Sequence, residues 1–315
     1  MLLVCQGVTP GHEGFVLTPD DKTTLPTNDP SSAEVIFPYL IGRELLTGDG
    51  QPMRSVIDFG QMTILDAQRY AAAFQHVKST VLPGIQDKAD KEHESESAHR
   101  DQLERWWMHW RPCREFIDAI EKLPRFLVCS RVTKRPIFVF VHHSIRPGDA
   151  LQAFSFQDDY SFGILQSHTH WLWFVTKCSK LKSDFRYTPP SVFDTFPWPQ
   201  AATVEQIDAV AAAARDVRRV RAEALPKLKG GLRALYRTLE LPGANPLKDA
   251  HAALDAAVLA AYSFSPKRDL LAQLLALNQE VAGKIERGEP VTAPGVPPDY
   301  PEPKKLVTED CIKPA

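Results

Sequence analysis

The chain has 315 residues, of which 43% are hydrophobic and 24% are charged. These values are ordinary for globular proteins, and they exclude a chain that is disordered, collagen-like or membrane-embedded throughout. The formal net charge of -2 gives no global reason to expect a polyanionic partner, so a nucleic-acid hypothesis has to rest on local charge. No apolar run approaches the roughly 18 to 20 residues that span a bilayer, and Met1–Cys5 is too short for a signal peptide, so we expect a cytoplasmic protein.

The cysteines are odd in number and widely scattered along the chain. No two of them are close enough in sequence to start a zinc knuckle or a redox motif. We therefore expect them to be reduced and mainly structural. They are Cys5, Cys113, Cys129, Cys178 and Cys311.

The first third of the sequence predicts a short β-rich opening followed mainly by helices. Ser31–Glu34 has the residue types of a helix cap, and we expect a helix over 35–46. Arg54–Phe59 alternates in the manner of a half-buried strand, and 65–81 has helical spacing. The segment 86–99 is highly charged without apolar periodicity, which indicates a solvated helix or a mobile insertion at the surface.

The middle of the sequence predicts a small antiparallel sheet. Three segments rich in Val, Phe and Ile are separated by polar turns. They are Phe126–Val132, Ile137–His142 and Leu151–Phe156. Ser161–Cys178 carries apolar residues at three- and four-residue steps, which indicates a helix. The following segment, 180–199, has too many prolines and aromatic residues for regular structure.

From residue 204 onward the composition changes to alanine, leucine and arginine. Three apolar stripes with helical spacing predict helices at 207–217, 250–261 and 270–285. The proline-rich segment 290–303 is typical of an extended strap or a disordered end. We therefore expect a separate helical module followed by a tail.

Local charge is uneven in the middle of the chain, where the segment 122–146 contains six cations and no acid. A basic stretch on strands can contact phosphates, and a solvated strand face explains the pattern equally well. The six are Lys122, Arg125, Arg131, Lys134, Arg135 and Arg146.

No complete catalytic centre can be assembled from the sequence. His142–His143 would point to opposite faces of a strand, and His168 and His170 would diverge on a helix, so we expect no metal site. Asp158–Asp159 lacks the acid-x-Lys partner of a nuclease, and no glycine-rich phosphate-binding fingerprint is present. A metal-dependent hydrolase that uses these histidines is the least favoured alternative.

Seven aromatic residues have the chemistry to stack on unpaired bases, which is a mode of single-strand binding. Aromatic residues on helices that flank a sheet are more often core or domain-interface residues, and we favour that interpretation. They are Trp106, Trp107, Trp110, Trp171, Trp173, Phe174 and Trp198.

Several longer strings resemble one family, the MmeI-like adenine-specific DNA methyltransferases and combined restriction-modification enzymes. Strings that resemble its target recognition domain are Phe37–Leu45, Ser55–Phe59, Arg125–Val132, Asp158–Ser167, Leu181–Thr188 and Val192–Pro199. Strings that resemble its helical C-terminal module are Leu232–Arg237, Pro242–Leu247 and Asp249–His251. Together they cover nearly the whole chain.

The resemblance implies an α+β protein: a mixed α/β target recognition domain with a small antiparallel sheet, then an all-α module. We place the recognition domain at 1–200, the helical module at 201–288 and a proline-rich tail at 289–315. The family's catalytic domain binds S-adenosylmethionine and carries an Asn-Pro-Pro-Tyr-type motif, and neither that motif nor the cofactor-binding glycine motif occurs here. We therefore expect this chain to be non-catalytic by itself and to hold no cofactor.

The resemblance also implies a partner and a site. A recognition domain of a restriction-modification or phage-defence system binds double-stranded DNA and reads base edges in the major groove. We expect the basic turn to contact DNA through Arg131, Thr133, Lys134 and Arg135. A second polar group suited to phosphates contains Lys182, Ser183, Arg186 and Tyr187. For each of these residues, a surface salt bridge or a turn role is the alternative.

Three further alternatives stay open at this stage. The chain is a split subunit that assembles with a separate methyltransferase catalytic chain, or it is a remnant of a truncated methyltransferase gene. It is also compatible with a protein-docking module that uses the charged segment 86–99 and the alanine-rich helices. The DNA sequence recognised cannot be read from one chain.

Overall fold

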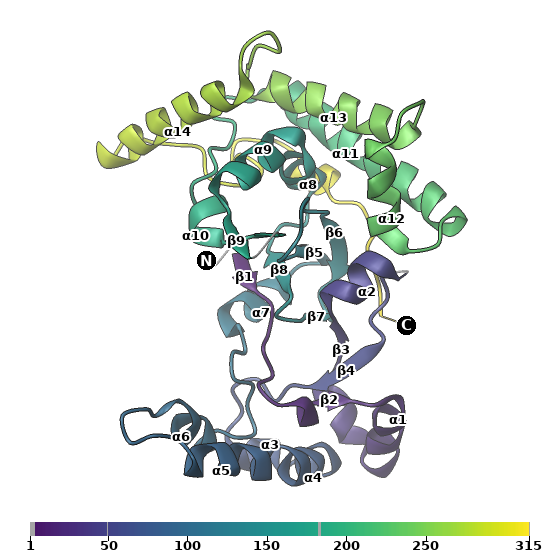
Figure 1. Ribbon diagram of the computed structural model, residues 1–315, viewed down its shortest axis with the longest axis vertical. Coiled ribbons are helices and arrows are strands. Elements are labelled where there is room, and N and C mark those ends of the chain that lie inside the picture. Colours follow the sequence, from purple (N-terminus) through teal and green to yellow (C-terminus); the bar gives the residue numbers. More distant parts are fainter. Residues whose placement is uncertain (1–3, 49, 182–183, 315) are drawn as a thin grey trace.

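Two four-stranded sheets form the centre of the protein in a computed structural model that describes residues 4–48, 50–181 and 184–314 (Figure 1). The first sheet has the order β1-β8-β5-β6, with strands Val4–Gln6, Leu151–Phe154, Arg125–Ser130 and Val139–His142. The second has the order β2-β4-β3-β7, with strands Val16–Leu17, Arg54–Ile57, Ile36–Leu40 and Arg146–Pro147. Only the β3–β7 pair is parallel among these strands.

Strand β5 separates two hydrophobic cores. All six of its residues are buried, and successive side chains point to opposite faces of the sheet. Leu127 and Cys129 belong to the core beneath the helices of the second half of the chain, whereas Phe126 and Val128 belong to the core around the second sheet. The predicted antiparallel sheet and the α+β class are therefore confirmed, with β5 at the centre.

Helices of the second half of the chain cover the first sheet from above in Figure 1. Their bounds are α8 Asp159–Gln166, α9 His168–Lys177, α10 Pro189–Val192, α11 Val204–Ala224, α12 Gly231–Arg237, α13 Pro246–Ala261 and α14 Leu270–Glu286. A hairpin of β9 (Ser179–Leu181) and β10 (Asp184–Arg186) lies in the segment predicted to be irregular. None of the helices in the described ranges is both long and apolar enough to cross a membrane.

The predicted helix 161–178 is two helices, α8 and α9. Ser167 has an extended backbone between them, and its hydroxyl oxygen accepts a hydrogen bond from the backbone N–H of His170. A serine that caps a following helix in this way ends the preceding one, because its own backbone leaves the helical conformation. The apolar periodicity continues across this break, so the sequence pattern did not indicate that the helix is interrupted.

The helices after residue 204 share the first of the two cores with the sheet. Val210 and Ala214 of α11 belong to the same cluster as Leu127 and Phe154. Helix α11 packs on α8 at Gly163, where an added Cβ would lie 2.6 Å from Val210 Cγ1. The boundary near residue 200 stays a prediction, and it does not coincide with a division between cores.

Shorter helices lie around and beside the second sheet, and α1 and α3 to α6 among them form the lower end of the molecule in Figure 1. They are α1 Pro19–Asn28, α2 Gly42–Thr47, α3 Ile64–Ala67, α4 Ala71–Thr80, α5 Leu82–Asp90, α6 Ala98–Leu103 and α7 Arg114–Ile120. The 3-10 helices in the described ranges are Glu13–Phe15, Pro30–Val35, Leu225–Lys227, Thr238–Glu240 and Pro303–Leu306. The charged segment 86–99 forms the end of α5, a turn and the start of α6.

The predicted helix over 35–46 is wrong in its first half, which forms strand β3. Pro38 lies in the middle of that strand and pairs with Ser55 of β4. A proline in a helix interior would remove a backbone hydrogen bond and clash with the preceding turn, so the strand is the favourable structure. The predicted helix 65–81 is likewise divided, into α3 and α4.

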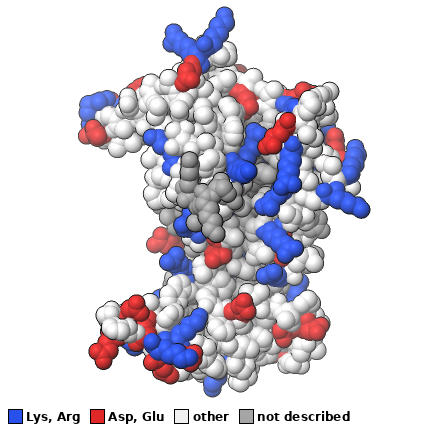
Figure 2. All heavy atoms as spheres, in the orientation of Figure 1, with Lys and Arg blue, Asp and Glu red and all other residues white. Residues whose placement is uncertain are grey.

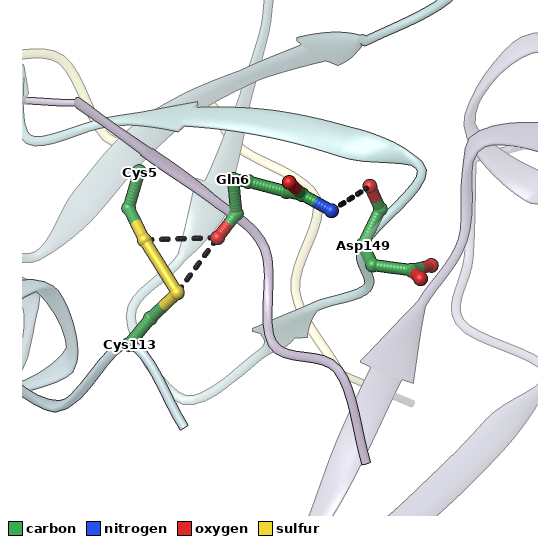
Figure 3. Close-up of a disulfide and its surroundings, with 4 residues drawn as sticks. All are labelled: Cys5, Gln6, Cys113 and Asp149. Atoms are coloured by element: carbon green, nitrogen blue, oxygen red, sulfur yellow. Dashed lines mark hydrogen bonds between the residues drawn. A yellow bond between two sulfur atoms is a disulfide. The ribbon is translucent and has the colours of Figure 1, made fainter. Parts of the chain in front are cut away.

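A disulfide joins Cys5 on β1 to Cys113 at the start of α7 (Figure 3). The Gln6 carbonyl oxygen lies 2.9 Å and 2.7 Å from the two sulfurs, and the Gln6 side-chain amide donates to the Asp149 carbonyl at 3.3 Å. This corrects the expectation that all five cysteines are reduced. The two cysteines are 108 residues apart in sequence, and only the fold brings them together.

The proline-rich tail lies along the molecule as an extended strap. The Thr292 N–H donates to the side-chain oxygen of Gln200 at 2.9 Å, and the Tyr300 hydroxyl donates to Asp208 at 2.5 Å. Near its end, the Ile312 N–H donates to the Phe140 carbonyl at 2.9 Å, beside β6. Of the two predicted alternatives, the extended strap is therefore the correct one.

A buried ion network connects the sheet, the helices and the tail. Arg125 of β5 is 1% exposed and its Nη2 lies 2.7 Å from Asp159, which is fully buried at the start of α8. Arg218 of α11 lies 2.7 Å from the same carboxylate and 2.6 Å from Asp310 in the tail. Burial opposes ionisation of Asp310, but the Arg218 hydrogen bond and charge outweigh it and lower the pKa of that carboxyl to about 2.

Removal of one partner from this network should destabilise the fold strongly. Asp159→Asn removes the fully buried carboxylate that Arg125 and Arg218 share and leaves Arg125 only the half-exposed Asp310, so we expect the free energy of unfolding to fall by about 3 to 5 kcal/mol. Urea denaturation, monitored by circular dichroism, measures this change in the free energy of unfolding. Arg219→Ala, which removes exposed pairs on α11, is the control and should change little. Equal stability of the two variants would contradict a structural role of the network.

Candidate nucleic-acid interface

The predicted basic turn is held on three sides by backbone hydrogen bonds. The Arg131 N–H donates to the Ala150 carbonyl at 2.9 Å, and the Arg131 carbonyl accepts from the Tyr187 N–H at 2.8 Å. The Thr133 N–H donates to the Phe185 carbonyl of β10 at 3.0 Å, while the Thr133 hydroxyl donates to the Arg135 carbonyl at 2.8 Å. Thr133 therefore holds the turn by internal bonds, and the turn is a fixed platform.

The side chains of Lys134 and Arg135 leave this platform at its end. Lys134 is exposed, and its carbonyl accepts a hydrogen bond from the indole N–H of Trp171 at 3.3 Å. The Arg135 guanidinium carbon lies 5.2 Å from the centre of the Trp171 ring and 5.9 Å from that of Tyr236. Cation–π contacts of this kind hold the guanidinium in place and leave it charged.

The second predicted group is only partly at the surface. Arg186 is half-buried, and its backbone forms a bridge with Val132, so the fold brings it next to the basic turn. Lys182 and Ser183 lie outside the described residues. Tyr187 is fully buried, and its hydroxyl lies 3.0 Å from Nε2 of His170. This burial corrects the expectation that Tyr187 contacts a phosphate, because the side chain has no exposed surface to offer.

Two of the six cations in 122–146 are structural. Arg125 belongs to the buried network described above. Arg146 is 2% exposed, with Nε 3.1 Å from Asp58 and Nη2 3.2 Å from Glu121. Burial of a charge demands a partner, and both arginines have one from distant parts of the chain. The basic pattern in the sequence thus combines core ion pairs with surface charge.

A pocket of about 330 Å³ lies between the basic turn and helix α12. One wall contains Lys134 and Arg135, and the other contains Arg233 and Arg237, one helical turn apart on α12. Glu240 is the acid among its lining residues in the described chain. Figure 2 shows Lys and Arg side chains gathered on this side of the upper body, over the region that α12 and α2 occupy in Figure 1.

Arg233 and Arg237 were not among the residues that the sequence indicated as a site. Their i, i+4 spacing in a helical segment was available as a signal, because such residues share a helix face. The spacing did not indicate which residues form the opposite wall of the pocket. Only the tertiary structure places this face across from Lys134 and Arg135.

A glycine fixes the position of α12 against α2. Gly231 has φ of +64°, and an added Cβ would lie 2.5 Å from the Gly48 carbonyl oxygen and 3.0 Å from that of Leu46. Both the backbone conformation and the lack of space exclude a side chain. The start of α12 therefore sits directly on the end of α2, and Leu46 also lines the pocket.

A buried polar chain supports the pocket from behind. Arg221 of α11 donates to the Tyr236 hydroxyl and, at 2.8 Å, to the Phe138 carbonyl. The same hydroxyl lies 3.0 Å from Nε2 of His251 on α13. Burial, with the nearby charges of Arg221 and Arg135, lowers the pKa of His251 to about 3.

The other sequence candidates for chemistry are structural or isolated. No group of three or more potential metal ligands occurs among the residues described, so the histidine pairs assemble no such cluster there. Four of the seven aromatic candidates, Trp106, Trp173, Phe174 and Trp198, are buried in the cores, as favoured. Asp159 belongs to the ion network rather than to a nuclease site.

The basic turn, the hairpin of β9 and β10, and helices α8 to α10 all lie within one segment that matches a known protein family. Residues 128–200 match the family model of the MmeI target recognition domain. The resemblance to the MmeI target recognition domain that was seen in the sequence is therefore confirmed for this segment.

Two particular relatives extend the comparison. Over 126 residues, the chain is 33% identical to DNA methyltransferase A of Bacillus subtilis (strain 168), and the matched part is 39% of this chain. A structure of the type IIL restriction-modification enzyme MmeI in complex with DNA matches with a TM-score of 0.71 at 20% identity over 90% of this chain, and this likeness shows the fold. The matched parts are 13% and 36% of the lengths of those two proteins.

Acid should weaken the buried polar framework around the site. The pKa values of His170 and His251 are about 3 in the folded protein, below the ordinary 6.5, because burial disfavours the charged imidazole. Between pH 6.5 and 3 the unfolded chain binds protons that the folded chain does not, so stability falls as the pH falls. We expect a loss of about 1.4 kcal/mol for each histidine between about pH 7.5 and about pH 5.5.

Urea denaturation at the two pH values measures this loss. His251→Gln keeps a hydrogen-bonding group for Tyr236 but does not titrate, so it should remove the His251 share of the pH dependence. An unchanged pH dependence in that variant would contradict the assignment to His251.

Proposed function

We propose that this chain recognises a specific short sequence in double-stranded DNA, as the specificity part of an adenine-specific DNA methyltransferase of a restriction-modification or phage-defence system. The observation that carries the proposal is the recognition-domain match over 128–200, which contains the fixed basic turn. A rigid platform with outward cations suits DNA, because phosphate contacts set the register in which other side chains reach base edges.

In such a system, sequence recognition and methylation are carried out by different domains or chains. Methylation of a base requires its extrusion from the duplex and its presentation to S-adenosylmethionine. In the proposal, a catalytic domain or a separate methyltransferase chain binds the cofactor and performs this step. The present chain supplies sequence recognition without catalysis, in the cytoplasm, where it meets its DNA.

Selection of bound duplexes from a random double-stranded library, at near-physiological salt, tests the proposal directly. We expect enrichment of one short motif. The affinity for that motif should fall linearly with salt on a double-logarithmic plot, because binding to phosphates releases counterions. A protein-docking module would give neither an enriched motif nor a steep salt dependence, and that outcome would reject the proposal.

Removal of the cations of the basic turn should weaken DNA binding without unfolding the protein. For Lys134→Ala with Arg135→Ala we expect roughly tenfold or greater reduction of duplex affinity and a shallower salt slope, by about one unit for each phosphate that is no longer neutralised. Fluorescence anisotropy measures both. Lys267→Ala with Arg268→Ala, two exposed cations in the loop between α13 and α14, is the matched control. Equal affinities of the two double variants would place the interface elsewhere.

A further inference from the structure

The pocket between the basic turn and α12 concentrates positive charge in one concave space. Lys134 and Arg135 on one side and Arg233 and Arg237 on the other are opposed by Glu240. Four cations and one acid leave a net charge of about three positive units at neutral pH. Like charges that share a pocket repel each other, so an anion in that space would stabilise the arrangement.

None of the four cations has an ion-pair partner within the described ranges. The arginines Arg218 and Arg219 on α11, by comparison, are paired with neighbouring carboxylates. Arg233, Arg237 and Lys134 are exposed and still meet no acid within 4.0 Å in the part of the chain that the structure describes. Their side chains therefore remain available to an anionic ligand.

The back of the pocket is rigid. The Tyr236 ring lies beneath Arg135, and the Tyr236 hydroxyl is fixed by Arg221 and His251. The Trp171 indole holds both the Lys134 carbonyl and the Arg135 guanidinium. A guanidinium that is already in position loses less conformational entropy when it binds an anion.

From these observations we propose that the pocket binds one phosphate group, held by Lys134 and Arg135 from the turn and by Arg233 and Arg237 from helix α12. Guanidinium groups match phosphate oxygens in bidentate geometry, and lysine adds a point charge. The inference rests on the proposed function for the source of the phosphate, which is the backbone of duplex DNA. It extends that function by adding the helical part of the chain to the DNA-binding surface.

The test replaces both arginines of α12. Arg233→Ala with Arg237→Ala should weaken binding of the selected duplex about tenfold or more and make the salt slope shallower, because fewer counterions are released when one phosphate fewer is neutralised. The lysine substitutions Arg233→Lys with Arg237→Lys should retain more affinity than the alanine substitutions, since they keep the charge, but less than wild type, since they lose the bidentate geometry. Lys267→Ala with Arg268→Ala is again the control, and urea denaturation verifies that each variant is folded. Wild-type affinity in the α12 alanine variant would overturn the inference.

A quadruple variant tests whether the two walls hold the same phosphate. Changes at independent, distant sites multiply in their effect on affinity, whereas residues of one cluster couple. If Lys134, Arg135, Arg233 and Arg237 share a phosphate, the reduction in affinity on replacing all four by alanine should be smaller than the product of the two double-variant reductions. A reduction equal to that product would indicate two separate phosphate sites and would overturn the shared pocket.

The pocket and the proposed function can fail separately. If the wild-type chain binds duplex DNA and the α12 alanine variant binds equally well, the proposed function stands and the pocket is wrong. If no duplex is bound, calorimetric titration with inorganic pyrophosphate tests whether the pocket binds phosphate, independently of DNA recognition. Pyrophosphate binding that is present in wild type and in the control but absent in the α12 alanine variant would support a phosphate pocket without DNA recognition. No binding of pyrophosphate in that case would overturn the pocket as well.

Discussion

The arrangement of the whole chain depends on one buried carboxylate. Asp159 is fully buried at the start of α8, where it receives Arg125 from the central strand and Arg218 from helix α11. Through Asp310 the same arginines also hold the tail. Buried charges are costly unless they are paired, so these segments can be in place only together. Sheet, helices and tail thus form one unit rather than independent parts.

This coupling matters for the candidate interface, because the pocket is built from both halves of the chain. The basic turn comes from segment 128–200, which matches the MmeI target recognition domain model, and α12 comes from the helices that follow it. Helix α12 in turn rests on α2, through the close approach at Gly231. The geometry of the positive surface is therefore set by packing among three distant segments. A shift of any one of them would separate the cations.

Charge in this protein has two distinct uses that look identical in a one-dimensional pattern. Arg125 and Arg146 are buried in ion pairs, whereas Lys134 at the end of the turn is exposed without one in the described chain. The difference lies in the partners, which are supplied by residues far along the chain. A basic stretch is thus an incomplete guide to a nucleic-acid surface, and burial decides which of its members are available to a ligand.

The sequence by itself determined the α+β class, the strands at the centre of the first sheet, the three long helices and the recognition-domain resemblance. These follow from local periodicity and from specific strings, which need no knowledge of distant segments. Only the tertiary structure decided the disulfide between Cys5 and Cys113 and the burial of Tyr187. It alone also placed α12 opposite the basic turn. Each of these depends on which segments meet in space, and that choice is made by packing and by pairing of buried charges across the whole chain.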